Sequence, residues 1–166
     1  MLIRPATPND ASAIAVIHVG TWQAAYRGMI PEAILDALSA DGRADFWHGL
    51  LSAEHRTMVA ESNAEVIGFC SLIPAREGET GVAEIAALYV IPAHWRQGAG
   101  GALCAAVFKA AIEDGFSTIT LWVLAANERA ISFYQAQGFA RDGTVRTEEL
   151  SDGSLIPEVR LRRRLP

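Results

Sequence analysis

The sequence predicts an α/β domain, built on a mixed β-sheet with helices on both faces. The hydrophobic pattern alternates between a period of two, typical of strands, and a period of three to four, typical of helices. The expected elements follow the order strand, helices, three strands, helix, strand, helix and two strands. The length of 166 residues and the hydrophobic fraction of 51% suit a single domain that spans residues 1–166.

The N-terminal third is expected to hold one strand and three helices. Residues 2–6 form a short apolar run, which ends in a turn rich in helix-capping residues at 7–10. Residues 11–25 carry apolar side chains at helical spacing. A second helical stretch opens at Pro31, and a third includes residues 46–51.

The rest of the chain alternates strands and helices. Residues 57–60 and 66–73 predict a hairpin, and 82–91 predict a strand that Pro92 ends. Residues 98–114 and 127–137 predict helices that flank a buried strand at 118–124. Residues 139–146 and 155–165 predict two final strands that turn at 151–153. The alternation of the last strand accounts for most of the arginine run Arg160, Arg162, Arg163 and Arg164.

Composition excludes several classes of protein. The apolar fraction is too high for a disordered chain, and a net charge of −5 argues against general nucleic-acid binding. No apolar run is long enough to span a bilayer, and no signal peptide is expected. Cys70 and Cys104 lack disulfide or metal spacing. We therefore expect a cytoplasmic protein with no metal and no membrane or nucleic-acid partner. Solvated or capping roles are expected for His18, His55 and His94.

A glycine-rich segment, residues 94–101 (HWRQGAGG), lies between a predicted strand and an apolar helix. Glycines at a helix start let backbone amides approach an anion, and the helix dipole favours negative charge there. A phosphate is the expected ligand, and the Arg96 side chain could pair with it. The dinucleotide fingerprint fails at Leu103, where it needs glycine, and the lysine of a P-loop is absent. A tight turn that only allows close packing is the alternative.

Two short patterns resemble the GNAT N-acetyltransferases. The run L-Y-V-x-P at residues 88–92, followed by R-Q-G-A-G-G, resembles the acetyl-CoA loop of that superfamily, with Trp95 as a departure at its first position. The pattern N-x-x-A-x-x-x-Y-x-x-x-G-F at residues 127–139 is similar to a second GNAT segment. The resemblance covers residues 84–139 most strongly, and implies a mostly antiparallel sheet of about seven strands. It implies acetyl-CoA as co-substrate, held by Leu88, Tyr89, Val90, Arg96, Gln97, Gly98, Ala99, Gly100, Gly101 and Asn127.

Acetyl transfer to an amine needs a group that takes a proton and a group that gives one. Glu84, on the strand before the loop, resembles the glutamate base of some GNAT members. The alternative is a strand residue that pairs with a cation such as Arg76. Glu32 and Asp36 are further candidates for the base.

The proton donor expected from the resemblance is Tyr134, which lies two helical turns past Asn127. A phenol with an ordinary pKa near 10 stays protonated and can donate to a leaving thiolate. A half-buried aromatic residue is the alternative for Tyr134, and a helix N-cap for Asn127. If the predicted strands 82–91 and 118–124 splay apart, backbone groups of the former could bind pantetheine, and the Val90 N–H could stabilise the oxyanion.

The acceptor site is expected among the N-terminal helices, where Trp22, Tyr26, Trp47 and His48 cluster. Trp22 and Tyr26 are the candidates for substrate binding, because aromatic rings can enclose an ammonium group. Core packing is the alternative, above all for Trp22 and Trp47.

These observations predict an enzyme that moves acetyl from acetyl-CoA to a primary amine of a small molecule or peptide, by direct transfer in a ternary complex. The alternatives are a non-catalytic acyl-CoA sensor and an acyltransferase for longer acyl groups. A homodimer is compatible with the sequence.

Overall fold

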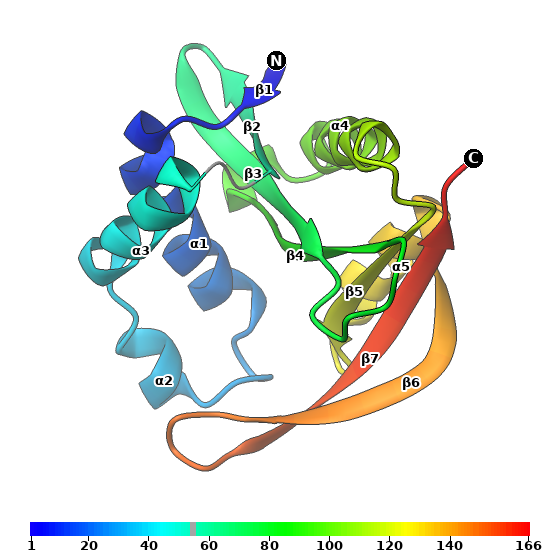
Figure 1. Ribbon diagram of the computed structural model, residues 1–166. Helices are drawn as coiled ribbons and strands as arrows, with labels where there is room; N and C mark the ends of the chain where they lie inside the picture. The colour runs from blue at the N-terminus through cyan, green and yellow to red at the C-terminus, as the bar shows by residue number, and fades with distance from the viewer. Residues whose placement is uncertain (54–55) are drawn as a thin grey trace.

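The structure is a computed structural model that describes residues 1–53 and 56–166. Its centre is a seven-stranded sheet in the order β1-β2-β3-β4-β5-β7-β6 (Figure 1). All neighbouring strands pair antiparallel except β4 and β5, which are parallel. The elements are β1 (Leu2–Pro5), the 3-10 turn η1 (Pro8–Asp10), α1 (Ala11–Ala25), α2 (Glu32–Asp36), α3 (Ala40–Ser52), β2 (Arg56–Ser62), β3 (Glu65–Pro74), β4 (Val82–Val90), η2 (Pro92–His94), α4 (Ala99–Glu113), β5 (Thr118–Leu124), α5 (Glu128–Ala136), β6 (Ala140–Glu149) and β7 (Leu155–Arg164).

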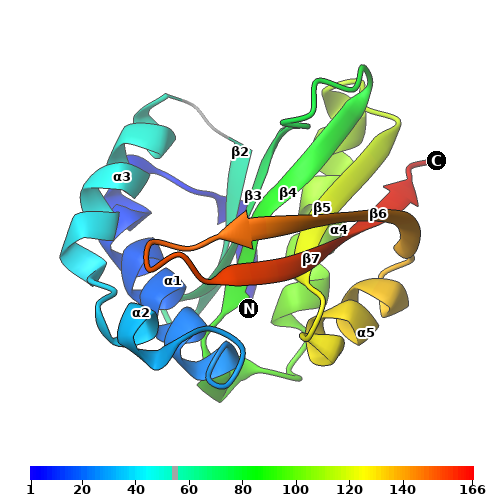
Figure 2. The same cartoon turned by 90° about the horizontal axis from the view of Figure 1, so that it is seen from below.

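Helices cover both faces of the sheet, as the sequence predicts (Figures 1 and 2). Successive side chains of a strand point to opposite faces, and β3 shows the consequence. Phe69 packs in the cluster formed with α1 and α3, whereas Cys70 packs in the cluster formed with α4. Both side chains are fully buried, so β3 is enclosed on both sides. In the described part of the chain, no helix is long and apolar enough to cross a membrane.

The parallel strands β4 and β5 diverge after a short contact. Their pairing begins at Val82 and Thr118 and ends at Glu84 and Thr120. The register between β3 and β4 shifts at this level, which leaves Ala86 of β4 without a partner. Such a bulge bends the strand that carries it. The predicted splay is therefore present, and the remainder of β4 runs away from β5.

The space between the diverging parts of β4 and β5, after Glu84 and Thr120, is called the fork below. The β6–β7 hairpin closes one side of it. It extends from the sheet toward α1 and α2 (Figure 2). There Ile156 of β7 and Leu124 of β5 are buried in a cluster with Ile30 and Leu35. The hairpin thus forms a wall opposite the N-terminal helices.

Two hairpins are longer than the sequence suggests. Asn63 and Ala64 adopt φ values of 51° and 65°, so a two-residue turn is enough to join β2 to β3. Residues 61–62 and 65 therefore belong to strands instead of the predicted loop. Similarly, β6 continues to Glu149 because its register with β7 extends to Leu155.

Two arginines of the run on β7 are in ion pairs within the protein. Arg160 pairs with Glu77 and Asp142, and Arg162 pairs with Glu79. This pairing gives Arg160 and Arg162 a role within the fold.

A buried carboxylate ties the N-terminus to α1. Asp10 accepts hydrogen bonds from Arg4 Nη1 at 2.8 Å and from the Thr7 N–H at 2.7 Å. The Arg4 hydrogen bonds, with smaller help from Thr7, lower the pKa of Asp10 to about 2. We expect Asp10→Asn to reduce the free energy of unfolding by about 1–2 kcal/mol at neutral pH.

This loss should depend on pH in one direction. Because the folded pKa of Asp10 is depressed from 3.8, its contribution is complete above about pH 4 and disappears as the pH falls toward 2. Urea unfolding of both proteins at several pH values measures it. An equal difference at pH 7 and pH 3 would contradict the assignment.

Candidate active site

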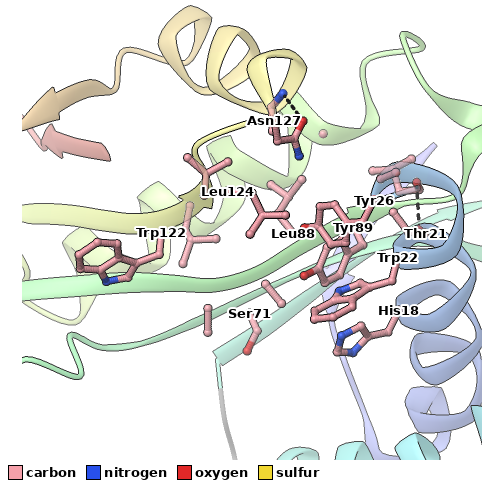
Figure 3. A pocket seen from close by; sticks show the side chains of 18 of the residues that line it. His18, Thr21, Trp22, Tyr26, Ser71, Leu88, Tyr89, Trp122, Leu124 and Asn127 are labelled. Atoms are coloured by element: carbon pink, nitrogen blue, oxygen red, sulfur yellow. Dashed lines mark hydrogen bonds between the residues drawn. The ribbon is translucent and has the colours of Figure 1, made fainter. Parts of the chain in front are cut away.

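A cavity of about 1170 Å³ occupies the fork between β4 and β5. Its walls come from α1, α3, β4, β5, α5 and the β6–β7 hairpin. Figure 3 shows Trp22, Tyr26 and Tyr89 gathered on the α1 side, with Asn127 at the start of α5 and Trp122 further along β5.

The glycine-rich loop lies at one end of this cavity. Arg96 and Gly98 adopt positive φ values of 60° and 87°, and Gly98 is the N-cap of α4. Arg96, Gly98, Gly100 and Gly101 line the cavity. The first amides of a helix have no partner inside it, so this end of α4 offers free N–H donors to an anion.

Two predicted loop residues do not line the cavity with their side chains. Gln97 is exposed, and its Nε2 donates to the Ala93 carbonyl at 2.9 Å. Ala99 is 1% exposed and belongs to the core. Any contact that these two residues make with a ligand therefore involves the backbone.

Trp95 fastens the loop to β4. Its Nε1 donates to the Val90 carbonyl at 2.6 Å, and the Arg129 guanidinium lies 3.8 Å from its ring centroid. This residue is the one that departs from the family pattern in the sequence. The sequence marks Trp95 only as a departure from the pattern. Its role in holding the loop becomes clear from its contacts with β4 and α5.

The last residues of β4 present backbone groups to the fork that β3 does not pair. Ile91 N–H bonds to Ile67 of β3, and antiparallel pairs alternate along a ladder. The N–H and C=O groups of Tyr89 therefore face β3, whereas those of Leu88 and Val90 face the fork. The Thr21 hydroxyl and Trp95 both donate to the Val90 carbonyl, which fits this orientation. Tyr89 meets the cavity through its side chain.

Asn127 and Tyr134 lie on the opposite side of the fork, where both line the cavity. Asn127 is 5% exposed and caps α5, since its Oδ1 accepts the Ala130 N–H at 3.1 Å. Tyr134 is 8% exposed, and burial raises its pKa well above the ordinary value. Within the described residues its hydroxyl has no hydrogen-bond partner, yet it is not among the enclosed unpaired atoms. The hydroxyl is thus accessible from the cavity and protonated.

Glu84 is placed differently from Tyr134. It is 1% exposed, at the point where the two strands part, and does not line the cavity. Its Oε1 accepts both Nε, at 2.9 Å, and Nη2 of Arg76, and its Oε2 accepts the Arg76 N–H at 3.3 Å. Both oxygens are occupied. The other carboxylates considered, Glu32 and Asp36, are exposed and pair with Arg27.

The aromatic residues of the N-terminal helices divide into two groups. Trp22 and Tyr26 line the cavity in contact with each other, with ring centroids 5.2 Å apart. Trp47 is 3% exposed and packs in the core, although one side also reaches the cavity. His48 is exposed and lies outside the cavity lining.

His18 corrects the sequence prediction of a solvated or capping residue. It is 8% exposed, and its Nδ1 accepts the Trp47 indole N–H at 3.2 Å. Its ring is stacked on Tyr89, with centroids 5.1 Å apart. Burial, followed by the charge of Arg43, lowers its pKa to about 4, so the ring is neutral at physiological pH. His55 lies outside the described residues.

No sequence pattern indicates the residues that the β6–β7 hairpin contributes. Arg146, Glu148 and Glu158 line the cavity, and the Arg146 guanidinium lies 4.2 Å from the Trp122 ring centroid. These residues look like ordinary strand positions in the sequence, and only the fold of the hairpin brings them to the fork.

Comparison with known proteins agrees with this geometry. The model of the acetyltransferase (GNAT) family matches residues 22–139. The chain belongs to this family. It is 33% identical to the uncharacterized N-acetyltransferase YuaI of Bacillus subtilis over 81% of this chain and 77% of that protein. It is 28% identical to the probable N-acetyltransferase Rv2775 of Mycobacterium tuberculosis over 95% of this chain and 90% of that protein.

Solved GNAT structures confirm the predicted fold class. A GCN5-related N-acetyltransferase from Rhodopseudomonas palustris superimposes with a TM-score of 0.80, 24% identity, and coverage of 99% of this chain and 95% of that one. YncA from Salmonella typhimurium, solved with acetyl-CoA, gives a TM-score of 0.75 and 22% identity, with coverage of 100% and 94%. The predicted enzyme class, an N-acetyltransferase, is confirmed by the family match.

Proposed function

We propose that this GNAT protein transfers acetyl from acetyl-CoA to a primary amine of a small molecule or peptide, directly within a ternary complex. The observation that carries the proposal is the Tyr134 hydroxyl, which is protonated and accessible in the cavity between the splayed strands. A buried tyrosine hydroxyl usually finds a hydrogen-bond partner, so an unpaired hydroxyl in a cavity supports a role in binding or catalysis. The acetyl-CoA bound in YncA supports the choice of donor.

The residues of the fork fit acetyl-CoA. The first amides of α4 and the Arg96 side chain would bind the pyrophosphate, because they are donors at the positive end of a helix. The backbone groups of Leu88 would bond to pantetheine amides as an added strand does, with Asn127 on the other side. The Val90 carbonyl already accepts from Thr21 and Trp95, which leaves the Val90 N–H as its free backbone group. Acetyl-CoA supplies the thioester and the leaving thiol.

Tyr134 would protonate the leaving sulfur, and the Val90 N–H would stabilise the charge that develops on the carbonyl oxygen. A direct attack by the amine also agrees with the state of the two cysteines. Burial raises the pKa of Cys104 to about 12 and that of Cys70 well above its usual value. Both therefore stay as unreactive thiols, which argues against an acetyl-cysteine on the pathway.

The base that the sequence predicts, Glu84, stays a prediction. Its bonds to Arg76 and its position outside the cavity lining mean that it could act only through intervening water. The homodimer and the cytoplasmic location also stay predictions.

The experiment that tests the proposed function is calorimetric titration with acetyl-CoA, followed by measurement of thiol release with a panel of primary amines. We expect a Kd in the micromolar range and release that depends on the amine. Absence of binding at millimolar acetyl-CoA would refute the proposal. Binding without release for any amine would favour the acyl-CoA sensor.

A further inference from the structure

Two buried carboxylates lie near the fork, but only one of them is open to the cavity. Glu158 of β7 is 7% exposed and lines the cavity. Its Oε2 accepts Arg146 Nε at 2.5 Å, and no described residue donates to its Oε1. In the described part of the chain, the enclosed side-chain polar atom without a partner is Trp22 Nε1. Oε1 of Glu158 is therefore accessible, whereas both oxygens of Glu84 are occupied.

The strand register places Glu158 close to the start of α5, in the cavity that Tyr134 also lines. Glu158 pairs with Leu124 of β5, and the chain passes from Leu124 to the Asn127 cap within three residues. Burial is the main cause that raises the pKa of Tyr26, and the neighbouring Tyr89 is the second. Tyr134 and Glu158 raise it further. Tyr26 lines the same cavity as both the proposed acid and Glu158.

The surroundings of Glu158 favour a cation. The charged or titratable groups that face it are Arg146 and Glu148 of β6, Arg76 of the β3–β4 loop, and the phenols of Tyr26 and Tyr89. Arg76 is already paired with Glu84. Glu158, Glu148 and Glu84 carry three negative charges against the two positive charges of Arg146 and Arg76, which leaves one net negative charge around Glu158. Arg43, Arg96 and Arg129 also line the cavity, but they are not among the charges that act on Glu158. The rings of Trp22, Tyr26, Tyr89 and Trp122 also line the cavity, and aromatic faces attract cations.

We propose that Glu158 binds the primary ammonium group of the acceptor through Oε1 and accepts its proton. This inference rests on the proposed function. It assigns to the β6–β7 hairpin the selection of the acceptor, which must carry a protonated amine that can enter an aromatic-lined cavity.

The step balances without a further reagent. The ammonium group gives a proton to Glu158, and the freed lone pair forms the bond from nitrogen to the carbonyl carbon. The bond from carbon to sulfur breaks, and the sulfur takes the proton of Tyr134. The amide nitrogen returns its remaining extra proton to Tyr134, and Glu158 releases its own to water.

Burial raises the pKa of Glu158, an effect that the hydrogen bond and charge of Arg146 oppose. Protonation of Glu158 should therefore limit kcat/KM on the acid side of the pH profile. Removing Arg146 should shift this acid limb to higher pH, because the opposing effect is lost.

The test compares Glu158→Gln, Arg146→Gln and Glu84→Gln with the wild type, using acetyl-CoA and phenethylamine, spermidine or glycinamide. Glu149→Gln is the matched control, because it removes the same charge from an exposed position of the same hairpin outside the cavity lining. We expect Glu158→Gln to lower kcat/KM about tenfold and to remove the acid limb, with acetyl-CoA affinity unchanged. Arg146→Gln should shift the limb upward, and Glu149→Gln should match the wild type.

Amine binding gives a readout that does not depend on turnover. With CoA present, tryptophan fluorescence should show that Glu158→Gln binds phenethylamine more weakly than the wild type does. The wild type should also bind the neutral 2-phenylethanol more weakly than it binds phenethylamine. The proposal would be overturned by equal binding in either of these comparisons. It would also be overturned if Glu158→Gln kept the acid limb of the pH profile, or if Glu84→Gln lost that limb instead. A wild type that binds no acetyl-CoA would refute the proposed function separately.

Discussion

Replacing Tyr134 by phenylalanine should lower kcat at least about 100-fold, with acetyl-CoA binding nearly unchanged. The ring packs against Phe133 and Phe139, with centroids 5.2 and 5.7 Å away, and phenylalanine keeps these contacts. The substitution removes only the hydroxyl, which has no partner among the described residues. Steady-state thiol release gives kcat, and calorimetry gives the affinity.

The pH profile makes this prediction sharper. Because burial raises the pKa of Tyr134 well above its ordinary value of 10, kcat of the wild type should not fall on the alkaline side below about pH 10. An unchanged kcat in Tyr134→Phe would remove Tyr134 from the role of acid. A large loss of acetyl-CoA affinity would indicate a binding role instead.

Replacing Gly98 by valine should weaken acetyl-CoA binding about 30-fold, which corresponds to about 2 kcal/mol. Gly98 has a φ of 87°, a conformation that a β-branched residue adopts only with strain. No atom lies within 4 Å of the place that a Cβ would occupy, so the expected effect comes from the backbone. A shift of this N-cap would turn the first amides of α4 away from the pyrophosphate.

Gly49→Ala provides the matched control. Gly49 lies in α3 with open space around its Cα, so alanine should stabilise the helix slightly and leave binding unchanged. Calorimetry measures both affinities, and thermal unfolding shows whether Gly98→Val remains folded. A folded Gly98→Val protein with wild-type affinity would show that the loop does not bind the pyrophosphate.

Local patterns were sufficient for most of the fold. The predicted strand at 118–124 agrees with β5 to the residue, because it is a near-continuous apolar run. The helix predicted from Ala11 to about Ala25 agrees with α1, because its apolar side chains recur at helical spacing. The predicted ends of the hairpin strands were less accurate. A turn at Asn63 and Ala64 depends on positive φ values, which these residue types only weakly indicate. The prediction for His18 was wrong because its burial results from contacts with Trp47 and Tyr89, which are distant in sequence.

By itself, the sequence determined the order of the elements, the glycine-rich helix start and the family, because these features reside in short, contiguous patterns. Only the tertiary structure decided which carboxylate is open to the cavity. Glu84 is closed off by Arg76, whereas Glu158 reaches the fork through the register of β7 with β5 and β6. The accessibility of a carboxylate oxygen depends on strands that are far apart along the chain, and no local pattern encodes that pairing.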